Sequence, residues 1–189
     1  MEFINRNLTF TENSIYYIDP DTQETHYIMM DWEKPIMKAH ADYICSNGGD
    51  ILEIGFGMGI SADYIQANNI NSHTIVECHP QVYNKAQEWA EDKPNVNIIL
   101  GDWYDVRNFL NAYDGLFFDT WGYNKNGAEF KDIIKYLMRK NGLATWWNSY
   151  NKEDNQLGIK ADSYDIIPVK PSPNLYFNYS EYYLPKKQF

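Results

Sequence analysis

ILEIGFGMG, at residues 51–59, is the most informative stretch of this sequence. Its first half is a continuous apolar run, which is typical of a strand buried on both faces. Its second half contains Gly55, Gly57 and Gly59, and a helical pattern starts directly after them. Glycine allows a sharp turn and lets the backbone approach a ligand closely. The stretch therefore predicts a ligand-binding turn between a strand and a helix of an α/β sheet.

The strand-then-helix order repeats along the chain, which favours a mostly parallel sheet with helices on both faces. We expect strands at residues 50–56, 73–78, 95–100, 114–121 and 143–150, and helices at 60–69, 81–92, near 105–112 and at 127–140. We further expect a hairpin at 14–30, a helix at 34–46 and two last strands near 163–169 and 174–184. The polar residues 151–162 are either a loop or a helix.

Composition excludes several functional classes. The 189 residues fit a single domain, and the formal charge of −10 disfavours non-specific binding to nucleic acid, because like charges repel. No apolar run is long enough to span a membrane, and the first residues lack a signal pattern, so a cytoplasmic protein is expected. Cys45 and Cys78 form no CxxC pair or His/Cys cluster, so we expect no metal site.

Acidic residues mark the ends of three successive predicted strands. Glu53 lies two residues before the first glycine, a position where an acid is typical of methyltransferases rather than dehydrogenases. Glu77 ends the second strand, where a carboxylate can accept hydrogen bonds from both ribose hydroxyls. Asp102 follows the third strand beside Trp103, which packs either on an adenine ring or in the core. Together these residues predict S-adenosylmethionine as the cofactor.

Five segments carry a resemblance to a known family. MMDWEKPIM (29–37), ILEIGFGMG, HTIVECHP (73–80), KPNVNIILGDWYDV (93–106) and YDGLFFDTWG (113–122) resemble the guanidinoacetate N-methyltransferase and fungal-type arginine N-methyltransferase 2 group. The resemblance implies a Rossmann-like class I methyltransferase fold of seven strands in the order 3-2-1-4-5-7-6. It also implies one domain, with an N-terminal lid at 1–48, a donor-binding core at 49–150 and C-terminal strands at 151–189.

The resemblance also implies site residues. Cofactor contacts are expected, beside Glu53, Gly55 and Asp102, at Met29, Met37, Phe56, Gly57, Met58, Gly59, Ile60, Ser61, Glu77, Cys78, His79, Trp103, Tyr104 and Asp119. Substrate contacts are expected at Glu33, Asp119, Ser149 and Tyr150. The chain departs from the family at Tyr104, where the guanidinoacetate enzyme has a glutamate, and in the short segment after the fifth strand. Asn148, Ser149 and Tyr150 replace the family's Asn-Leu-Thr.

The chemistry of a guanidino acceptor explains why two carboxylates are needed. A guanidinium is planar, carries five N–H donors and has a very high pKa, because its charge is delocalised. Two carboxylates on different edges can hold it flat and aim one nitrogen at the donor methyl. One carboxylate must also take a proton. We assign both catalytic roles by position, to Glu33 and Asp119, with Asp119 as the proton acceptor.

Other interpretations stay open at this level. Asp119 could be a cap after a strand, and Glu33 could simply favour a helix N-terminus. The acceptor could be a small guanidino compound, another small amine or an arginine in a protein. A non-catalytic S-adenosylmethionine-binding protein would have no chemical need for both carboxylates, and an NAD-dependent oxidoreductase would need a second substrate domain. The sequence leaves the oligomeric state open.

Overall fold

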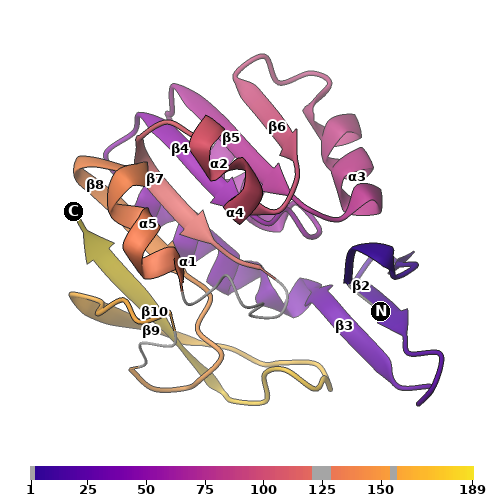
Figure 1. The fold of residues 1–189 in the computed structure, drawn as a ribbon. Helices are drawn as coiled ribbons and strands as arrows, with labels where there is room; N and C mark the ends of the chain where they lie inside the picture. The colour runs from indigo at the N-terminus through magenta and orange to yellow at the C-terminus, as the bar shows by residue number, and fades with distance from the viewer. Residues whose placement is uncertain (1–2, 121–128, 154–156) are drawn as a thin grey trace.

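The computed structural model describes residues 3–120, 129–153 and 157–189. A seven-stranded sheet in the order β6-β5-β4-β7-β8-β10-β9 forms the centre of the molecule (Figure 1). Its strands are β4 (Asp50–Ile54), β5 (Ser72–Glu77), β6 (Val96–Leu100), β7 (Tyr113–Phe118), β8 (Met138–Trp146), β9 (Ser163–Pro168) and β10 (Glu181–Gln188). Counted along the chain, this sheet has the expected order 3-2-1-4-5-7-6.

The pairing of the strands confirms a mostly parallel sheet. β4 pairs in parallel with β5 and β7, and the next neighbours, β6 and β8, continue the parallel arrangement. β10 runs antiparallel to both β8 and β9. Because the carboxyl ends of parallel strands meet at one edge, the residues that follow β4, β5, β6, β7 and β8 gather there.

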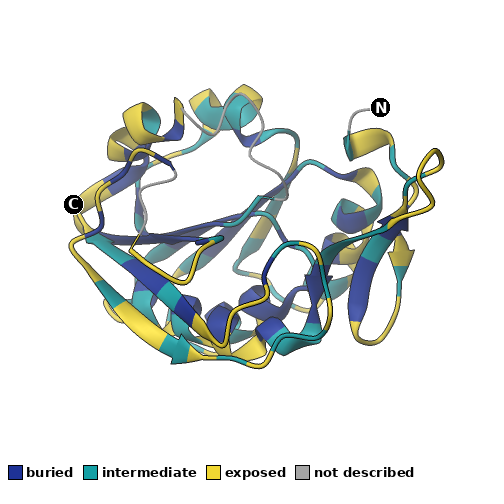
Figure 2. Cartoon of the chain, turned by 90° about the horizontal axis from the view of Figure 1, so that it is seen from below, coloured by how far each residue is buried: buried dark blue, intermediate teal, exposed yellow. Residues whose placement is uncertain are grey.

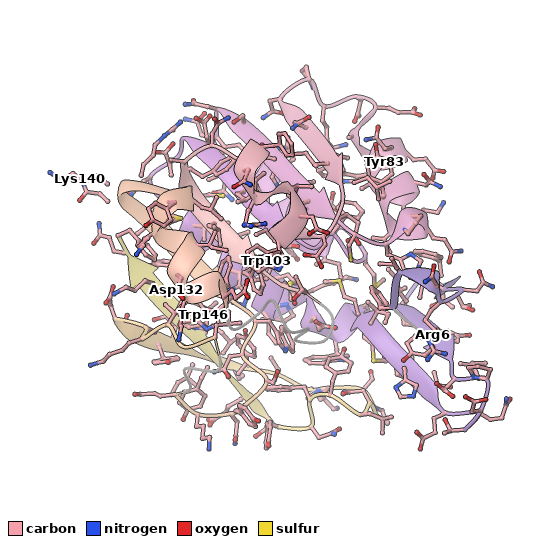
Figure 3. All side chains as sticks on the ribbon, viewed as in Figure 1. Arg6, Tyr83, Trp103, Asp132, Lys140 and Trp146 are labelled. Atoms are coloured by element: carbon pink, nitrogen blue, oxygen red, sulfur yellow. The ribbon has the colours of Figure 1, made fainter. Side chains whose placement is uncertain are left out.

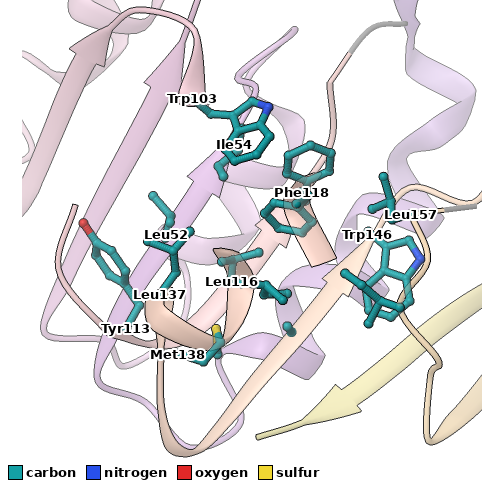
Figure 4. Close-up of a cluster of buried hydrophobic side chains, with 14 of the residues drawn as sticks. Leu52, Ile54, Trp103, Tyr113, Leu116, Phe118, Leu137, Met138, Trp146 and Leu157 are labelled. Carbon is teal, nitrogen blue, oxygen red and sulfur yellow. The ribbon is translucent and has the colours of Figure 1, made fainter. Parts of the chain in front are cut away.

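Helices cover both faces of the sheet, as the sequence predicts. Phe117, Ile75 and Ile51 face α1 (Lys34–Ile44), α2 (Ile60–Gln66) and α3 (Pro80–Ala90). Leu52, Ile54, Leu116 and Phe118 face the opposite layer, and Figure 4 shows them packed with residues of α4 and α5. In Figure 1, α4 (Trp103–Val106) and α5 (Phe130–Leu137) lie in front of the sheet and α1 lies behind it. Figure 2 shows this buried centre and the exposed outer surface.

A second, smaller sheet precedes the core. The expected hairpin is present as β2 (Ser14–Ile18) and β3 (Thr25–Met30), and β1 (Thr9–Phe10) adds a strand that was not expected. The short 3₁₀ turns η1 (Phe3–Asn5), η2 (Asp31–Glu33) and η3 (Arg107–Phe109) complete the elements. α1 begins with Pro35 in its first turn, where proline's missing N–H costs no helical hydrogen bond.

Several expected boundaries are wrong. The strand expected at 143–150 is β8, which begins five residues earlier, at Met138, and ends at Trp146. The strand expected to reach residue 56 ends at Ile54, and the helix expected to reach residue 69 ends at Gln66. The helix expected to reach residue 140 ends at Leu137, and Met138 already pairs with Tyr113 in the sheet. The strand expected at 174–184 begins only at Glu181, because the Asn174 side chain holds the preceding residues in a turn. The short helix expected near 105–112 starts earlier, at Trp103, where Asp102 accepts the Tyr104 N–H at 2.9 Å.

Some expectations fall outside the described residues. These are residue 121 of the fourth expected strand, the start of the following helix at 127–128, and residues 154–156 of the polar stretch. The fourth strand itself ends earlier than expected, at Phe118, because Asp119 and Thr120 are described and lie outside it. The described parts of 151–162 contain neither helix nor strand. Within the described residues, no helix has the length and apolar character needed to cross a membrane.

Candidate functional site

The glycine turn joins β4 to α2 and has the conformation that glycine permits. Gly55 and Gly57 have φ angles of 97° and 55°, in the left-handed region that disfavours other residues. A Cβ at residue 55 would overlap the carbonyl oxygen of Asp119, and one at residue 57 would lie 2.6 Å from Sδ of Met29. The N–H of Met58 also donates to that sulfur at 3.2 Å. The turn is therefore packed against both β3 and the end of β7.

Glu77 is held in place by the backbone on both sides of it. Its Oε2 accepts the N–H of Phe56 at 3.0 Å, and its Oε1 accepts the N–H of His79 at 2.7 Å. Burial raises the pKa of Glu77, and these hydrogen bonds oppose that rise. The backbone and the thiol of Cys78 also hydrogen-bond this carboxylate. This is an oriented carboxylate at the edge where the glycine turn lies.

Glu53 and Ser61 lie beneath the turn rather than beside it. The Ser61 hydroxyl donates to Oε1 of Glu53, and Nε2 of His73 lies 3.0 Å from Oε2. All three side chains are buried. They tie β4 to the first turn of α2 and to β5, so the structure gives them a positioning role. Direct contact of Glu53 or Ser61 with a cofactor stays a prediction.

Three residues that follow β6 have different surroundings: Asp102 caps a helix, Trp103 lies in the core, and Tyr104 is partly exposed. The Asp102 carboxylate caps α4. Trp103 packs edge-on against Phe118 and Phe130 at centroid distances of 5.6 and 5.3 Å, which places its ring in the core beside α5 (Figure 3). Tyr104 lies under the Arg107 guanidinium, 3.7 Å from the ring centroid. A cofactor contact at these three positions stays a prediction.

Other expected cofactor residues point their side chains into the protein. His79 accepts the N–H of Gln81 at 3.2 Å through Nδ1, and its Nε2 lies 3.0 Å from the Arg6 carbonyl. Met37, Phe56 and Ile60 are core residues. Burial raises the pKa of the Cys78 thiol to about 12, which makes it a poor nucleophile. Contacts from these positions would have to come mainly from the backbone.

Glu33 occupies the turn between β3 and α1 and is almost fully buried. Its Oε1 accepts the N–H of Met30 at 2.7 Å and the hydroxyl of Tyr176 at 2.6 Å. Burial, together with the nearby charge of Asp119, raises the pKa of Glu33 to about 8. A carboxyl group with this pKa is mostly protonated near neutral pH, and a cation bound beside it favours loss of the proton.

Asp119 follows β7 and is half-buried at the same edge of the sheet. Its N–H donates to the carbonyl of Ile54 at 2.9 Å, which fixes it beside the glycine turn. Burial raises the pKa of Asp119 to about 7, and the charges of Glu53 and Glu77 add to that rise. The structure therefore brings Glu33 and Asp119, which are distant in sequence, close enough for their charges to interact.

The residues after β8 contain a functional candidate that the sequence reasoning missed. Asn148 is buried and donates from Nδ2 to the carbonyls of Lys152 and Tyr183, while its Oδ1 accepts the N–H of Tyr150. Ser149 is half-buried and Tyr150 is exposed. Asn148 thus shapes the backbone at the two expected substrate residues. A polar residue directly after an apolar strand was the available signal.

A buried histidine supports the same loop from below. His40 on α1 lies 2.8 Å from the Thr145 hydroxyl and 2.9 Å from the Tyr182 hydroxyl. Burial lowers the pKa of His40 to about 3, so the ring is neutral near pH 7. The Tyr182 hydroxyl in turn accepts the N–H of Asn148 at 2.8 Å. α1, β8 and β10 are therefore joined beneath the loop.

An aromatic cluster on the acceptor side was also missed. It consists of Trp32, Trp147, Tyr176 and Phe177, with ring centroids 5.8–6.2 Å apart between the tryptophans and the other two rings. Tyr176 and Phe177 lie in the stretch expected as a strand. Aromatic enrichment of this stretch was visible in the sequence, but its partners, Trp32 in η2 and Trp147 directly after β8, were not.

The described residues contain no group of three or more His, Cys, Asp or Glu side chains that could hold a metal ion. The polar groups at the carboxyl edge are instead the carboxylates of Glu33, Glu77 and Asp119, with the glycine turn between them. Such a site suits a cationic or hydroxyl-bearing organic ligand.

Comparison with solved structures shows the fold. Spermidine synthase from Thermotoga maritima superposes with a TM-score of 0.62 over 97% of this chain and 73% of its own, at 14% identity. TYW2 from M. jannaschii in complex with AdoMet gives a TM-score of 0.58 over 97% and 84%, at 12% identity. The arrangement is the Rossmann-like class I methyltransferase fold, as the sequence predicts.

Comparison with curated proteins finds relatives called protein arginine N-methyltransferase 2. The Yarrowia lipolytica protein is 32% identical over 78% of this chain and 33% of its own length. The Candida glabrata protein is 31% identical over 99% of this chain and 52% of its own. The chain thus spans between a third and about half of the length of these relatives. The model of the guanidinoacetate N-methyltransferase family matches residues 8–151, most of the chain, so the chain belongs to that family.

Proposed function

We propose that this protein is an S-adenosylmethionine-dependent N-methyltransferase whose acceptor is the guanidino group of a small, guanidinoacetate-like molecule. The observation that carries the acceptor is a pair of carboxylates, the buried Glu33 and the half-buried Asp119, at the edge where the glycine turn lies. Two neighbouring carboxylates with raised pKa values, caused by burial, suit a cation that forms hydrogen bonds on two edges.

The residues present fit the methyl donor. A Cβ at Gly57 would meet Met29, so the turn leaves room only for backbone there. Glu77 is an oriented carboxylate at the end of β5, the place where a carboxylate can accept hydrogen bonds from ribose hydroxyls. Glu77 and the backbone of Gly55–Gly59 would therefore hold the donor. When bound, S-adenosylmethionine supplies an electrophilic methyl group on a sulfonium.

The two carboxylates would bind the acceptor and remove its proton. Glu33 and Asp119 would hold the planar guanidinium and turn one nitrogen toward the donor methyl. As the new C–N bond forms, the bond from the methyl carbon to sulfur would break and leave a neutral thioether. The nitrogen must then lose a proton, and Asp119 would accept it. Burial raises the pKa of Asp119 to about 7, which suits a base that works near neutral pH. The negative pair also offsets the repulsion between two cationic reactants.

Calorimetry followed by turnover tests this proposal. We expect binding of S-adenosylmethionine but not of NAD, and then methyl transfer to at least one member of a panel of guanidino acids. NAD binding without donor binding would overturn the proposed reaction. Donor binding without turnover of any guanidino compound would overturn the proposed acceptor.

A protein arginine is the second candidate acceptor, because the curated relatives are called protein arginine N-methyltransferase 2. The side-chain guanidinium would engage the same carboxylates. Arginine-containing peptides belong in the same turnover panel, since preference for a peptide over free guanidino acids would favour this candidate.

The pH dependence of kcat/KM should follow the two carboxylates. In the free protein, burial raises the pKa of Glu33 to about 8 and that of Asp119 to about 7. Below these values both groups are neutral and attract a cation weakly. We therefore expect kcat/KM for a guanidinium substrate to rise between pH 6 and 8.5, estimated from those two pKa values. A profile measured at constant ionic strength that is flat or falls over this range would contradict the assignment.

The same groups affect the stability of the ligand-free protein in the opposite direction. Their pKa values are raised above those of the unfolded chain by burial, so the fold binds more protons than the unfolded chain does. Their contribution is therefore fully present below the unfolded pKa and is lost as pH rises through 7 to 8. Thermal unfolding across this range provides a companion measurement that does not depend on turnover.

A further inference from the structure

Tyr176 contacts the acceptor-side carboxylate from a different part of the chain. It lies between β9 and β10, and its hydroxyl donates to Oε1 of Glu33 at 2.6 Å. The N–H of Met30 donates to the same oxygen at 2.7 Å. Among the described residues, no hydrogen bond reaches Oε2 of Glu33. Two donors thus fix one oxygen and leave the other for a ligand.

The turn that presents Tyr176 is built by one side chain. Oδ1 of Asn174 accepts the N–H groups of Tyr176 and Phe177 at 2.8 and 2.7 Å. Its Nδ2 donates to the carbonyls of Ser172 and Phe177, both at 2.8 Å. An amide that uses both its oxygen and its nitrogen in this way holds the turn in one conformation. The direction of Tyr176 is therefore set locally, before any contact with Glu33.

The surroundings of the Tyr176–Glu33 contact are aromatic. Trp32, which precedes Glu33, stacks on both Tyr176 and Phe177 at interplanar angles of 25° and 22°. Trp147, which precedes Asn148, packs on the same two rings. A hydrogen bond enclosed by such rings is stronger than one in water. The turn at 174–177 therefore connects the two stretches that flank the acceptor side.

We propose that Tyr176 is a positioning residue for the acceptor: its hydroxyl holds Glu33 so that the free oxygen meets the guanidino nitrogen. The inference rests on the proposed function, because it needs Glu33 to bind the acceptor. Tyr176 touches Glu33 and not the reacting atoms, so its effect is on acceptor binding and on the ionisation of Glu33.

Tyr176→Phe tests this with a matched control on the same loop. Tyr179→Phe removes the same hydroxyl from a partly exposed residue that packs on Phe177. We expect Tyr176→Phe to raise the acceptor KM about tenfold, as for loss of a hydrogen bond to a charged group, and to change kcat much less. Donor affinity should stay unchanged in both variants. An acceptor KM for Tyr176→Phe equal to that of Tyr179→Phe would overturn the proposal.

Two further measurements distinguish positioning from general loosening of the loop. The acid limb of kcat/KM should move to higher pH in Tyr176→Phe, because the ionised Glu33 loses a donor and its pKa rises. In Glu33→Gln, which should itself raise the acceptor KM, adding Tyr176→Phe should have little further effect, since the two residues act as one unit. Fully additive effects, or an unmoved acid limb, would contradict the proposal.

Failure of the proposed function would appear separately. Carboxyl NMR of labelled Glu33 reports its pKa without any turnover. A rise in the pKa of Glu33 in Tyr176→Phe but not in Tyr179→Phe, caused by loss of the donor, supports the Tyr176–Glu33 link. If the wild-type protein then methylates no guanidino compound, the acceptor assignment is overturned while that link stands.

Discussion

Asp119→Asn is expected to lower kcat by about 10³-fold, within the range seen when a general base is removed. The amide cannot accept the proton that leaves the guanidino nitrogen, and it removes one of the two charges that hold the cation. The substitution adds no volume, and the Asp119 N–H can still donate to Ile54, so the edge of the sheet should keep its shape.

Asp114→Asn is the matched control for that variant. Asp114 lies on the same strand at its opposite end, where it accepts the N–H of Asp50 and pairs with Arg139. This control should retain near-wild-type kcat, even where stability falls slightly. Steady-state kinetics with donor affinity measured in parallel checks the pair. Near-wild-type turnover by Asp119→Asn would refute its role as the base.

Gly55→Ala is expected to abolish measurable donor binding and to destabilise the fold by about 3 kcal/mol or more, as steric strain at a positive φ does. The added Cβ would overlap the carbonyl oxygen of Asp119, which is backbone and cannot move alone. Relief requires β4 and β7 to separate at the edge that we propose binds both donor and acceptor. Chemical denaturation and calorimetry would measure the two effects.

Gly48→Ala separates backbone strain from steric overlap. Gly48 also has a positive φ, of 65°, but a Cβ there meets only the Asn69 carbonyl oxygen at 3.0 Å, away from the site. We expect a loss of about 1 kcal/mol with normal donor affinity, the usual cost of an L residue at such an angle. Equal donor affinity in Gly55→Ala and wild type would show that the turn does not form the donor site.

The centre of the sheet was predictable because β4, β5 and β7 are buried on both faces. In a chain where strands and helices alternate, continuous apolar runs such as those around Leu52 and Leu116 indicate buried strands. Elsewhere, local hydrogen bonds prevented a segment with strand propensity from forming a strand. The aromatic residues at 176–179 have high strand propensity, but the four hydrogen bonds of Asn174 impose a turn.

The site was only partly predictable for a related reason. Glu33 and Asp119 each lie in a recognisable sequence motif, at or shortly after the end of a predicted strand. Their positions could therefore be inferred before their surroundings were known. Tyr176 and Asn148 act through partners that are distant in sequence. Nothing local in YFNYSEYYL indicates which tyrosine reaches Glu33. Glu53 was identified by its acidic character, but its contacts with Ser61 and His73 could not be inferred from the sequence.

The short segment from Met29 to Glu33 belongs to both halves of the site. Met29 touches the glycine turn through its sulfur, and the N–H of Met30 donates to Glu33, the proposed acceptor carboxylate. A change in the position of this segment on donor binding would therefore also move Glu33. The two ligands are then thermodynamically linked, and linkage is reciprocal: the factor by which the donor tightens the acceptor equals the factor by which the acceptor retains the donor. A five-residue connection would thereby couple the proposed donor and acceptor sites through the backbone of one segment.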